Sequence, residues 1–164
     1  MTGMYRLGHQ GAALAVYAPL GLALLLLGRP RLAVVGGAVS VALASLPDVD
    51  QRLPGVTHRG VTHTVGFAVA VGTVLGAVGW LLGSDAGVGT AVEYAAVGFA
   101  VGTTAVVSHL LADVITPMGI TPFWPVSDRH YTFGVCRADN TLANYALLGL
   151  GIALTVAVLA VAPR

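Results

Sequence analysis

Charged side chains are scarce in this chain of 164 residues. Only 9% of the residues are charged, against roughly 25% in a typical soluble domain. Lysine is absent, so all eight fixed positive charges are arginines, and the net charge of +1 gives no strong attraction for nucleic acid. A single cysteine, Cys136, excludes a disulfide framework within the chain and leaves the redox compartment open.

Hydrophobic residues make up 56% of the chain, and its mean hydropathy is +0.85. A bilayer-spanning helix needs about 20 predominantly apolar residues. Five stretches fit, although the second is short and can begin nearer Pro30; they are 10–28, 32–46, 57–83, 90–115 and 141–162. We expect an all-α integral membrane protein, a bundle of about five transmembrane helices forming a single domain over residues 1–164.

The first apolar stretch is long for a signal peptide, and Arg29-Pro30-Arg31 after it offers no small-residue cleavage site. We interpret it as a retained transmembrane helix. Glycines with GxxxG spacing, as at Gly72 and Gly76, indicate close packing of helices in lipid.

Residues of the metal-binding types gather in the stretch 46–64, LPDVDQRLPGVTHRGVTHT. Alternating spans put this stretch on the same side of the membrane as the residue before the first helix and the end of the fourth. Seven candidate ligands then share one side and come from four helix ends: His9, Asp48, Asp50, His58, His63, His109 and Asp113. The sequence therefore predicts a polar metal site at one membrane face.

Simpler interpretations exist for each residue alone. His9 can be an interfacial polar residue, and an aspartate after Pro47 is commonly a turn former or cap. His109 and Asp113 share one face of a helix and can be a buried hydrogen-bonded pair. The gathering of all seven on one side favours a common site.

Imidazole together with carboxylate suits zinc, manganese or Fe(II), and the histidine content makes zinc the first choice, as one or two ions. Such centres commonly hydrolyse phosphoesters with metal-activated water. We expect Asp50 to accept the proton in catalysis and Arg59, between two histidines, to bind a substrate phosphate bidentately.

The residues His9, LPDVD at 46–50, HRGVTHT at 58–64 and HLLADVITPMGITPFWP at 109–125 resemble the YdjM-like family. Its members are small membrane proteins described as predicted membrane-bound metal-dependent hydrolases. The resemblance implies a metal site formed by the seven candidate ligands. A more distant likeness, in the order of ligands, is to zinc-dependent phospholipase C and single-strand nucleases. It implies phosphoester hydrolysis, but the later His-x-x-x-Glu ligands of those enzymes have no match here.

The expected function is metal-dependent hydrolysis of a phosphoester or phospholipid in the cell membrane, with the lipid bilayer as partner and no nucleic acid. The alternative is a non-catalytic membrane protein with a structural or sensing metal site, or a transporter-like ion site. Five arginines on the site side against three on the other predict that the site faces the cytoplasm.

Overall fold

The computed structural model describes residues 6–162. Five long helices occur there: α1 (Arg6–Leu26), α2 (Pro30–Leu43), α3 (Val65–Gly83), α4 (Val88–Val114) and α5 (Thr141–Val161). Three short 3-10 helices join them: η1 (Pro47–Arg52), η2 (Val61–His63) and η3 (Ser84–Ala86). With α2 and η1 taken together, five segments are long and apolar enough to cross a membrane, and the described residues contain no strand. The all-α membrane fold is confirmed.

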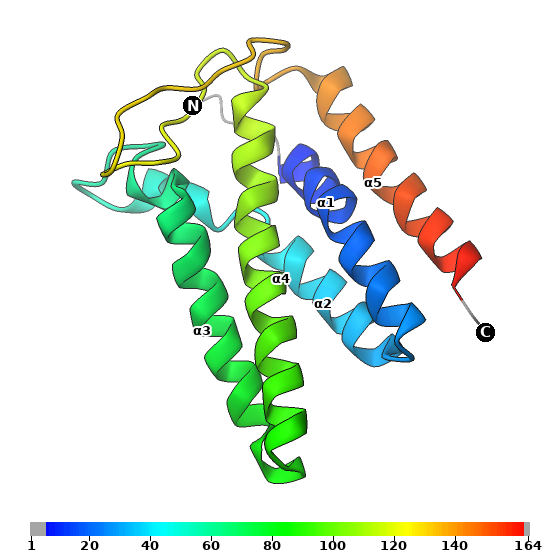
Figure 1. Cartoon of the computed structure of the whole chain (residues 1–164). Coiled ribbons are helices and arrows are strands. Elements are labelled where there is room, and N and C mark those ends of the chain that lie inside the picture. The colour runs from blue at the N-terminus through cyan, green and yellow to red at the C-terminus, as the bar shows by residue number, and fades with distance from the viewer. Residues whose placement is uncertain (1–5, 163–164) are drawn as a thin grey trace.

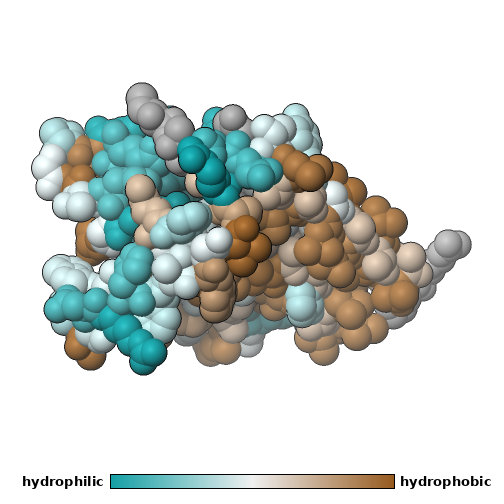
Figure 2. Space-filling model, turned by 90° about the horizontal axis from the view of Figure 1, so that it is seen from above, coloured by the Kyte–Doolittle hydropathy of each residue, from teal (hydrophilic) through white to brown (hydrophobic). Residues whose placement is uncertain are grey.

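The helices form a bundle with two different ends (Figure 1). The first residues of α1, α3 and α5 and the last residues of α2 and α4 lie at one end, beneath the long connection between α4 and α5. The tight turns α1–α2 and α3–α4 lie at the other end. Seen from above the first end, hydrophilic residues gather over the connecting segments and hydrophobic ones cover the side where α5 lies (Figure 2).

The third helix begins at Val65, later than the predicted start at 57. The backbone at Arg59 has a φ of 59°, a left-handed conformation that a helix cannot contain. Its N–H is held by the Asp50 carboxylate instead of a helical carbonyl. Thr64 then starts α3, because its side chain accepts a hydrogen bond from Phe67 N–H. The residues just before Val65 thus lie outside the helix, and their side chains can take part in the site.

Helix α1 begins at Arg6, earlier than predicted, so His9 lies in its first turn and not ahead of it. Helix α2 begins at Pro30, as its short predicted length suggested. Proline suits a first helical position because its missing N–H would have no partner there. The early start of α1 therefore places His9 within the bundle. The start of α2 at Pro30 keeps the turn between α1 and α2 short.

Glycines allow the helices to approach closely. A side chain at Gly102 of α4 would come within 2.9 Å of the Cα of Gly72 on α3, and one at Gly11 of α1 would collide with the backbone of Leu147 on α5. Helix α4 also packs against α1 and α2, so it lies at the centre of the bundle. The residues near its C-terminal end are consequently surrounded by the other helices.

An ion pair marks the opposite end of the bundle. Arg29, in the turn between α1 and α2, pairs with Glu93 of α4. Glu93 and Asp113 are twenty positions apart on α4, about 30 Å along a helix, which is the thickness of the hydrocarbon core of a bilayer. Asp113 and the Arg29–Glu93 pair are thus separated by a distance that fits opposite boundaries of a membrane.

Backbone hydrogen bonds hold the connection between α4 and α5 over the end of the bundle where α4 ends and α5 begins. Ile120 and Tyr131 form an isolated antiparallel bridge, with N–H···O distances of 3.0 and 2.9 Å. Val65 N–H donates to the carbonyl of Pro122 at 2.8 Å, and Phe133 N–H donates to Val114 at 2.7 Å. These bonds fix the connection to both α3 and α4, next to the candidate site.

Candidate metal centre

His109 is held in one tautomer by the neighbouring helix. It lies near the end of α4, and its Nδ1 is 2.7 Å from the carbonyl oxygen of Ala44, just beyond α2. A carbonyl oxygen can only accept, so Nδ1 carries the hydrogen. In the neutral ring the lone pair is then on Nε2, which points into the bundle toward His63.

His63 is held in the same way from its other side. Its Nδ1 lies 3.3 Å from Asp50 Oδ2 and 3.1 Å from the Thr62 hydroxyl. The carboxylate is an acceptor, so the Nδ1 hydrogen of His63 belongs on this side. The Nε2 atom of His63 faces the Nε2 atom of His109 across 3.1 Å. Two lone pairs thus converge on one point.

Two carboxylates complete the group. Asp113 Oδ2 lies 3.2 Å from His63 Nε2 and 3.4 Å from His109 Nε2. Asp48 Oδ1 lies 3.7 Å from each of the same two nitrogens. The side chains of His63 and His109 are fully buried, whereas that of Asp48 is 21% exposed. Solvent therefore reaches the group from the Asp48 side.

These spacings fit one divalent ion. Ligand atoms about 2.0–2.1 Å from a common ion lie about 2.9 Å apart at a right angle and about 3.4 Å apart at the tetrahedral angle. The three distances among His63, His109 and Asp113, 3.1–3.4 Å, lie within this range, and the two distances to Asp48, 3.7 Å each, lie slightly above it. Asp113 Oδ2 is buried without a hydrogen-bond donor. Facing acceptors of this kind are stabilised by a cation between them, and His63, His109 and Asp113 could hold a metal ion.

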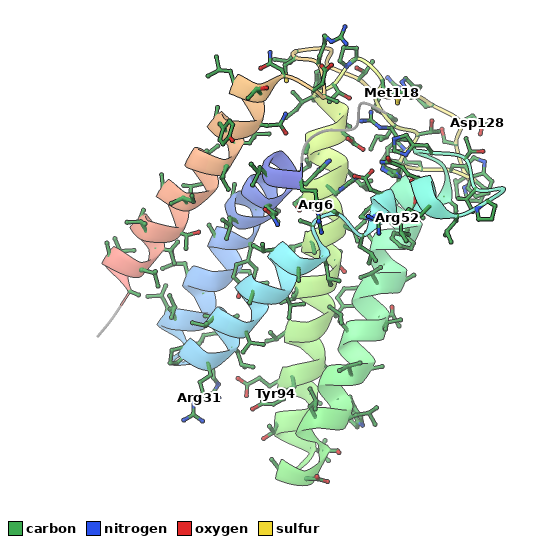
Figure 3. The ribbon with its side chains drawn as sticks, turned by 180° about the vertical axis from the view of Figure 1, so that it is seen from behind. Arg6, Arg31, Arg52, Tyr94, Met118 and Asp128 are labelled. Atoms are coloured by element: carbon green, nitrogen blue, oxygen red, sulfur yellow. The ribbon has the colours of Figure 1, made fainter. Side chains whose placement is uncertain are left out.

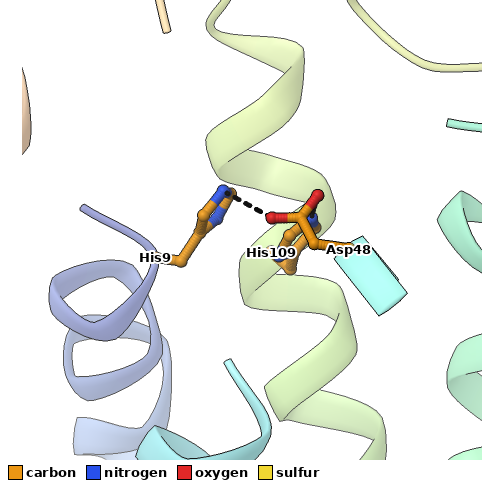
Figure 4. A group of neighbouring side chains, drawn as sticks. All are labelled: His9, Asp48 and His109. Atoms are coloured by element: carbon orange, nitrogen blue, oxygen red, sulfur yellow. Dashed lines mark ion pairs between the residues drawn. The ribbon is translucent and has the colours of Figure 1, made fainter. Parts of the chain in front are cut away.

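His9 faces the second oxygen of each carboxylate. Its Nε2 lies 3.9 Å from Asp48 Oδ2 and 4.0 Å from Asp113 Oδ1. Figure 4 shows the contact between His9 and Asp48. The ring of His9 stacks on that of His109, with centroids 3.8 Å apart. Together with Asp48 and His109, it forms a second group of atoms close enough to hold an ion. His9 therefore borders the same centre from α1.

Asp50 lies behind His63 and not with the converging atoms. Its Oδ2 accepts from Arg59 N–H at 2.9 Å and from the Thr62 hydroxyl at 3.0 Å, in addition to facing His63. Its Oδ1 is 3.0 Å from Nδ1 of His58. None of the three groups of potential ligands in the described chain includes Asp50. Its geometry is that of a carboxylate that orients a histidine ligand.

His58 occupies the outer side of the same cluster. Its side chain is 33% exposed, unlike the buried rings of His9, His63 and His109. It forms a third potential group with Asp48 and His63. His58 and Asp48 are thus the cluster members that solvent reaches.

Arg59 places a buried positive charge beside the centre. Its Nη2 donates to Asp113 Oδ1 at 2.7 Å, and its Nη1 donates to Thr116 Oγ1 at 2.9 Å and to the Gly119 carbonyl at 3.0 Å. The Nε atom is buried and has no hydrogen-bond partner. Arg59 therefore joins the α4 carboxylate to the connection that follows α4.

The protonation of His63 depends on the carboxylates around it. Burial disfavours a charged ring, but the nearby carboxylates of Asp113, Asp48 and Asp50 together outweigh it and raise the pKa of His63 above its usual value. Without a metal, a proton can occupy the space between the acceptors. Protons and metal ions therefore compete for the same place.

All seven predicted ligands come together, six as members of the potential ligand groups and Asp50 behind them. Sequence reasoning missed the Ala44 carbonyl and the Thr116 hydroxyl. Ala44 contributes a backbone atom, so its side chain gives no signal, and Thr116 is one of many threonines. Neither partner could be recognised before the helices were placed.

The sequence model for the YdjM inner membrane protein family matches residues 4–163. The match covers nearly all of the chain, which belongs to this family. No curated protein and no solved structure matches the chain. Membership places the protein in the inner membrane, in agreement with its five apolar helices.

Proposed function

We propose that this protein is a metal-dependent hydrolase that cleaves a phosphoester at the surface of the inner membrane. The observation that carries the proposal is the convergence of His63 Nε2, His109 Nε2 and Asp113 Oδ2 within 3.4 Å of one another. Asp48 adds a fourth, partly exposed ligand. A buried group of acceptors with one solvent-facing member suits an ion that must also meet substrate.

The ligand set of two histidines and two aspartates suits zinc, and also manganese or Fe(II). When bound, such an ion lowers the pKa of water and stabilises negative charge on phosphate oxygens. We propose one ion, because the Arg59 cation already binds the Asp113 oxygen that faces His9. A second divalent ion at that oxygen would meet like charge at close range.

Asp50 supports the site as a positioning residue. Both of its oxygens are already engaged, and its contact with Nδ1 keeps the lone pair of His63 on Nε2. The sequence-based role of proton acceptor is better served by a carboxylate that solvent reaches. Asp48 is that carboxylate among the aspartates of the cluster.

Arg59 can still bind a substrate phosphate. A guanidinium has five N–H donors, and three hydrogen bonds to Asp113, Thr116 and Gly119 leave two of them unused. One of the two is on Nε, which is buried without a partner. The other is on Nη2, and the two together can bind phosphate oxygens. These contacts also hold the guanidinium rigid, which reduces the entropy lost on binding.

The place of the site indicates the substrate class. The cluster lies near the C-terminal end of α4, which Figure 1 shows beneath the long connection to α5. The phosphate of a phospholipid lies at the same depth, just outside the hydrocarbon core. A phospholipid headgroup can thus reach the site without leaving the bilayer, and we propose a phospholipid-type phosphoester as the substrate.

One observation favours a second function. Two histidines and two aspartates alone complete a tetrahedral shell, and a closed shell is typical of structural zinc. In that case the ion would stabilise or sense and would not catalyse. An ion-binding transporter fits less well, because the ionisable groups of α4 lie near its two ends, at Glu93 and at His109 with Asp113.

The test uses the purified full-length protein in phospholipid nanodiscs. Metal content is measured by mass spectrometry, and hydrolysis of bis(p-nitrophenyl) phosphate and of the nanodisc lipid is measured after chelation and after addition of zinc, manganese or iron. We expect about one bound ion per chain and activity that returns with metal. Asp48→Ala should abolish both.

Asp139→Ala is the matched control, because Asp139 lies on the same side and pairs with the exposed Arg137. It should keep both metal and activity. A folded protein that binds no metal would refute the site. Bound metal without hydrolysis of either substrate would refute the enzyme and leave the structural role.

A further inference from the structure

An apolar groove runs from near the metal-centre end of the bundle toward the opposite end. Its volume is about 550 Å³, and α1, α2 and α5 form its walls. Along α1 it runs from Leu14 to Leu25, away from His9 and toward the Arg29 turn. All three walls belong to membrane-spanning segments. The groove therefore opens toward the hydrocarbon of the bilayer.

The walls of the groove leave no side-chain hydrogen-bonding group for an occupant to satisfy. Two polar side chains line it, and both are satisfied within the protein: the Tyr17 hydroxyl donates to the Ala33 carbonyl at 2.7 Å, and the Thr155 hydroxyl donates to the Gly151 carbonyl at 2.9 Å. The other lining residues are apolar, from small ones such as Ala18 and Gly21 to larger ones such as Leu25. An occupant made of hydrocarbon alone fits such a lining.

A positive charge lies near the outer end of the groove, where Arg31 lines a neighbouring polar pocket with Arg29 and Glu93 and not the groove itself. Arg31 follows Pro30 at the start of α2, and it makes no hydrogen bond or ion pair within residues 6–162, whereas Arg29 is paired with Glu93. Val34 and Ala38 line the groove three and seven positions further on, so Arg31 shares their helix face. Figure 3 shows Arg31 at the end of the bundle opposite Arg52 and Asp128.

We propose that an anionic phospholipid binds here, with its phosphate at Arg31 and one acyl chain in the groove. The phosphate would lie at the membrane boundary marked by Arg29 and Glu93, opposite the metal centre. The N-terminal end of α2 adds a favourable dipole for an anion. The binding site is independent of the proposed enzymatic function.

The size of the groove favours an acyl chain over a helix from a second copy of the protein. Between Leu14 and Leu25 the groove is about 16 Å long. A helix with its side chains is about 10 Å wide. An unbranched chain is thinner and can follow the space between the three helices.

Native mass spectrometry of the intact protein, titrated with phosphatidylglycerol or with phosphatidylcholine of the same chains, tests the proposal. We expect one tightly retained phosphatidylglycerol, bound at least fivefold more strongly than phosphatidylcholine. Arg31→Gln should remove this preference but keep binding of both lipids. Ala38→Phe, which fills the groove from an exposed position, should weaken both lipids by a similar factor.

Matched controls are Arg52→Gln, on the opposite face, and Ala70→Phe, on the exposed side of α3. Both should bind lipid as the unmodified protein does, and Ala38→Leu gives a milder filling if Ala38→Phe does not fold. Equal affinity for the two lipids, or a preference that survives Arg31→Gln, would overturn the headgroup assignment. Unchanged binding in both Ala38 variants, or a dimer whose crosslinks map to the groove, would overturn the acyl-chain assignment.

Discussion

His63 Nε2 and His109 Nε2 lie 3.1 Å apart, although the Nδ1 atom of each ring already faces an oxygen acceptor. Two neutral imidazoles in this arrangement direct lone pairs at each other, which is unfavourable in a buried site. A cation between them removes the conflict, and the nearby Asp113 carboxylate strengthens its binding. This pair of nitrogens is the reason to expect metal in the purified protein.

Replacing Asp50 should weaken metal binding without abolishing it. Asp50→Asn changes the partner of His63 Nδ1 but leaves the converging atoms in place. We expect a loss of about 10- to 100-fold in metal affinity, as is usual for residues that orient a ligand. Asp48→Asn, which alters a converging atom, should lose more. Titration with a competing chelator measures both, and equal losses would contradict the distinction.

Metal affinity should fall as the pH is lowered. Burial lowers the pKa of His63, but the carboxylates of Asp113, Asp48 and Asp50 together outweigh it, so the pKa is raised. Below that pKa a proton occupies the nitrogen that the metal needs, so the affinity falls by about tenfold per pH unit for each proton displaced. Above it the affinity levels off. Isothermal titration between pH 5 and 8, with circular dichroism at each pH to confirm folding, would show this slope or refute it.

Arg59→Lys should reduce hydrolysis while leaving bound metal in place. A lysine keeps the charge but cannot reach Asp113, Thr116 and a phosphate at once, because it lacks the planar fork of arginine. We expect activity to fall about 100-fold. Arg137→Lys, an exposed arginine on the same side, is the control. Full activity in Arg59→Lys would show that the guanidinium geometry does not matter for substrate.

A larger side chain at Gly102 should destabilise the α3–α4 pair. A Cβ at Gly102 would meet the backbone of Gly72 at 2.9 Å, and backbone atoms cannot turn away as a flexible side chain can. We expect Gly102→Val to cost about 1–3 kcal/mol. Gly89→Ala is the control, because a Cβ there meets nothing within 4 Å. Thermal unfolding in detergent compares them, and equal midpoints would argue against this contact.

The single cysteine offers a test of orientation. Cys136 lies in the connection between α4 and α5, on the site side, and is partly exposed. The arginine distribution predicts that this side is cytoplasmic. A membrane-impermeant maleimide should therefore label Cys136 only after the cells are opened. In a Cys136→Ser background, Ser84→Cys should be labelled in intact cells. The reverse pattern would place the site outside the cytoplasm.

The sequence was sufficient to predict the five apolar spans and to place the candidate site residues at one common end of the bundle. Hydropathy identifies a membrane helix because a bilayer excludes unpaired backbone groups, whatever the tertiary structure. Alternation of five spans then brought His9, Asp48 and His109 to one face. The start of α3 could not be predicted, because Arg59 leaves helical geometry through a contact with Asp50 in another segment.

The division of roles within the cluster was decided by tertiary structure. Asp48 and Asp50 are two positions apart in one motif and look equivalent in sequence. Only the folded chain directs Asp48 to the converging nitrogens and Asp50 to the back of His63. The Ala44 carbonyl fixes His109 from a different helix, and no pattern of side chains encodes that contact. Sequence therefore determines which residue types reach the membrane face, whereas distances of a few ångströms between helices determine which atoms can bind a metal.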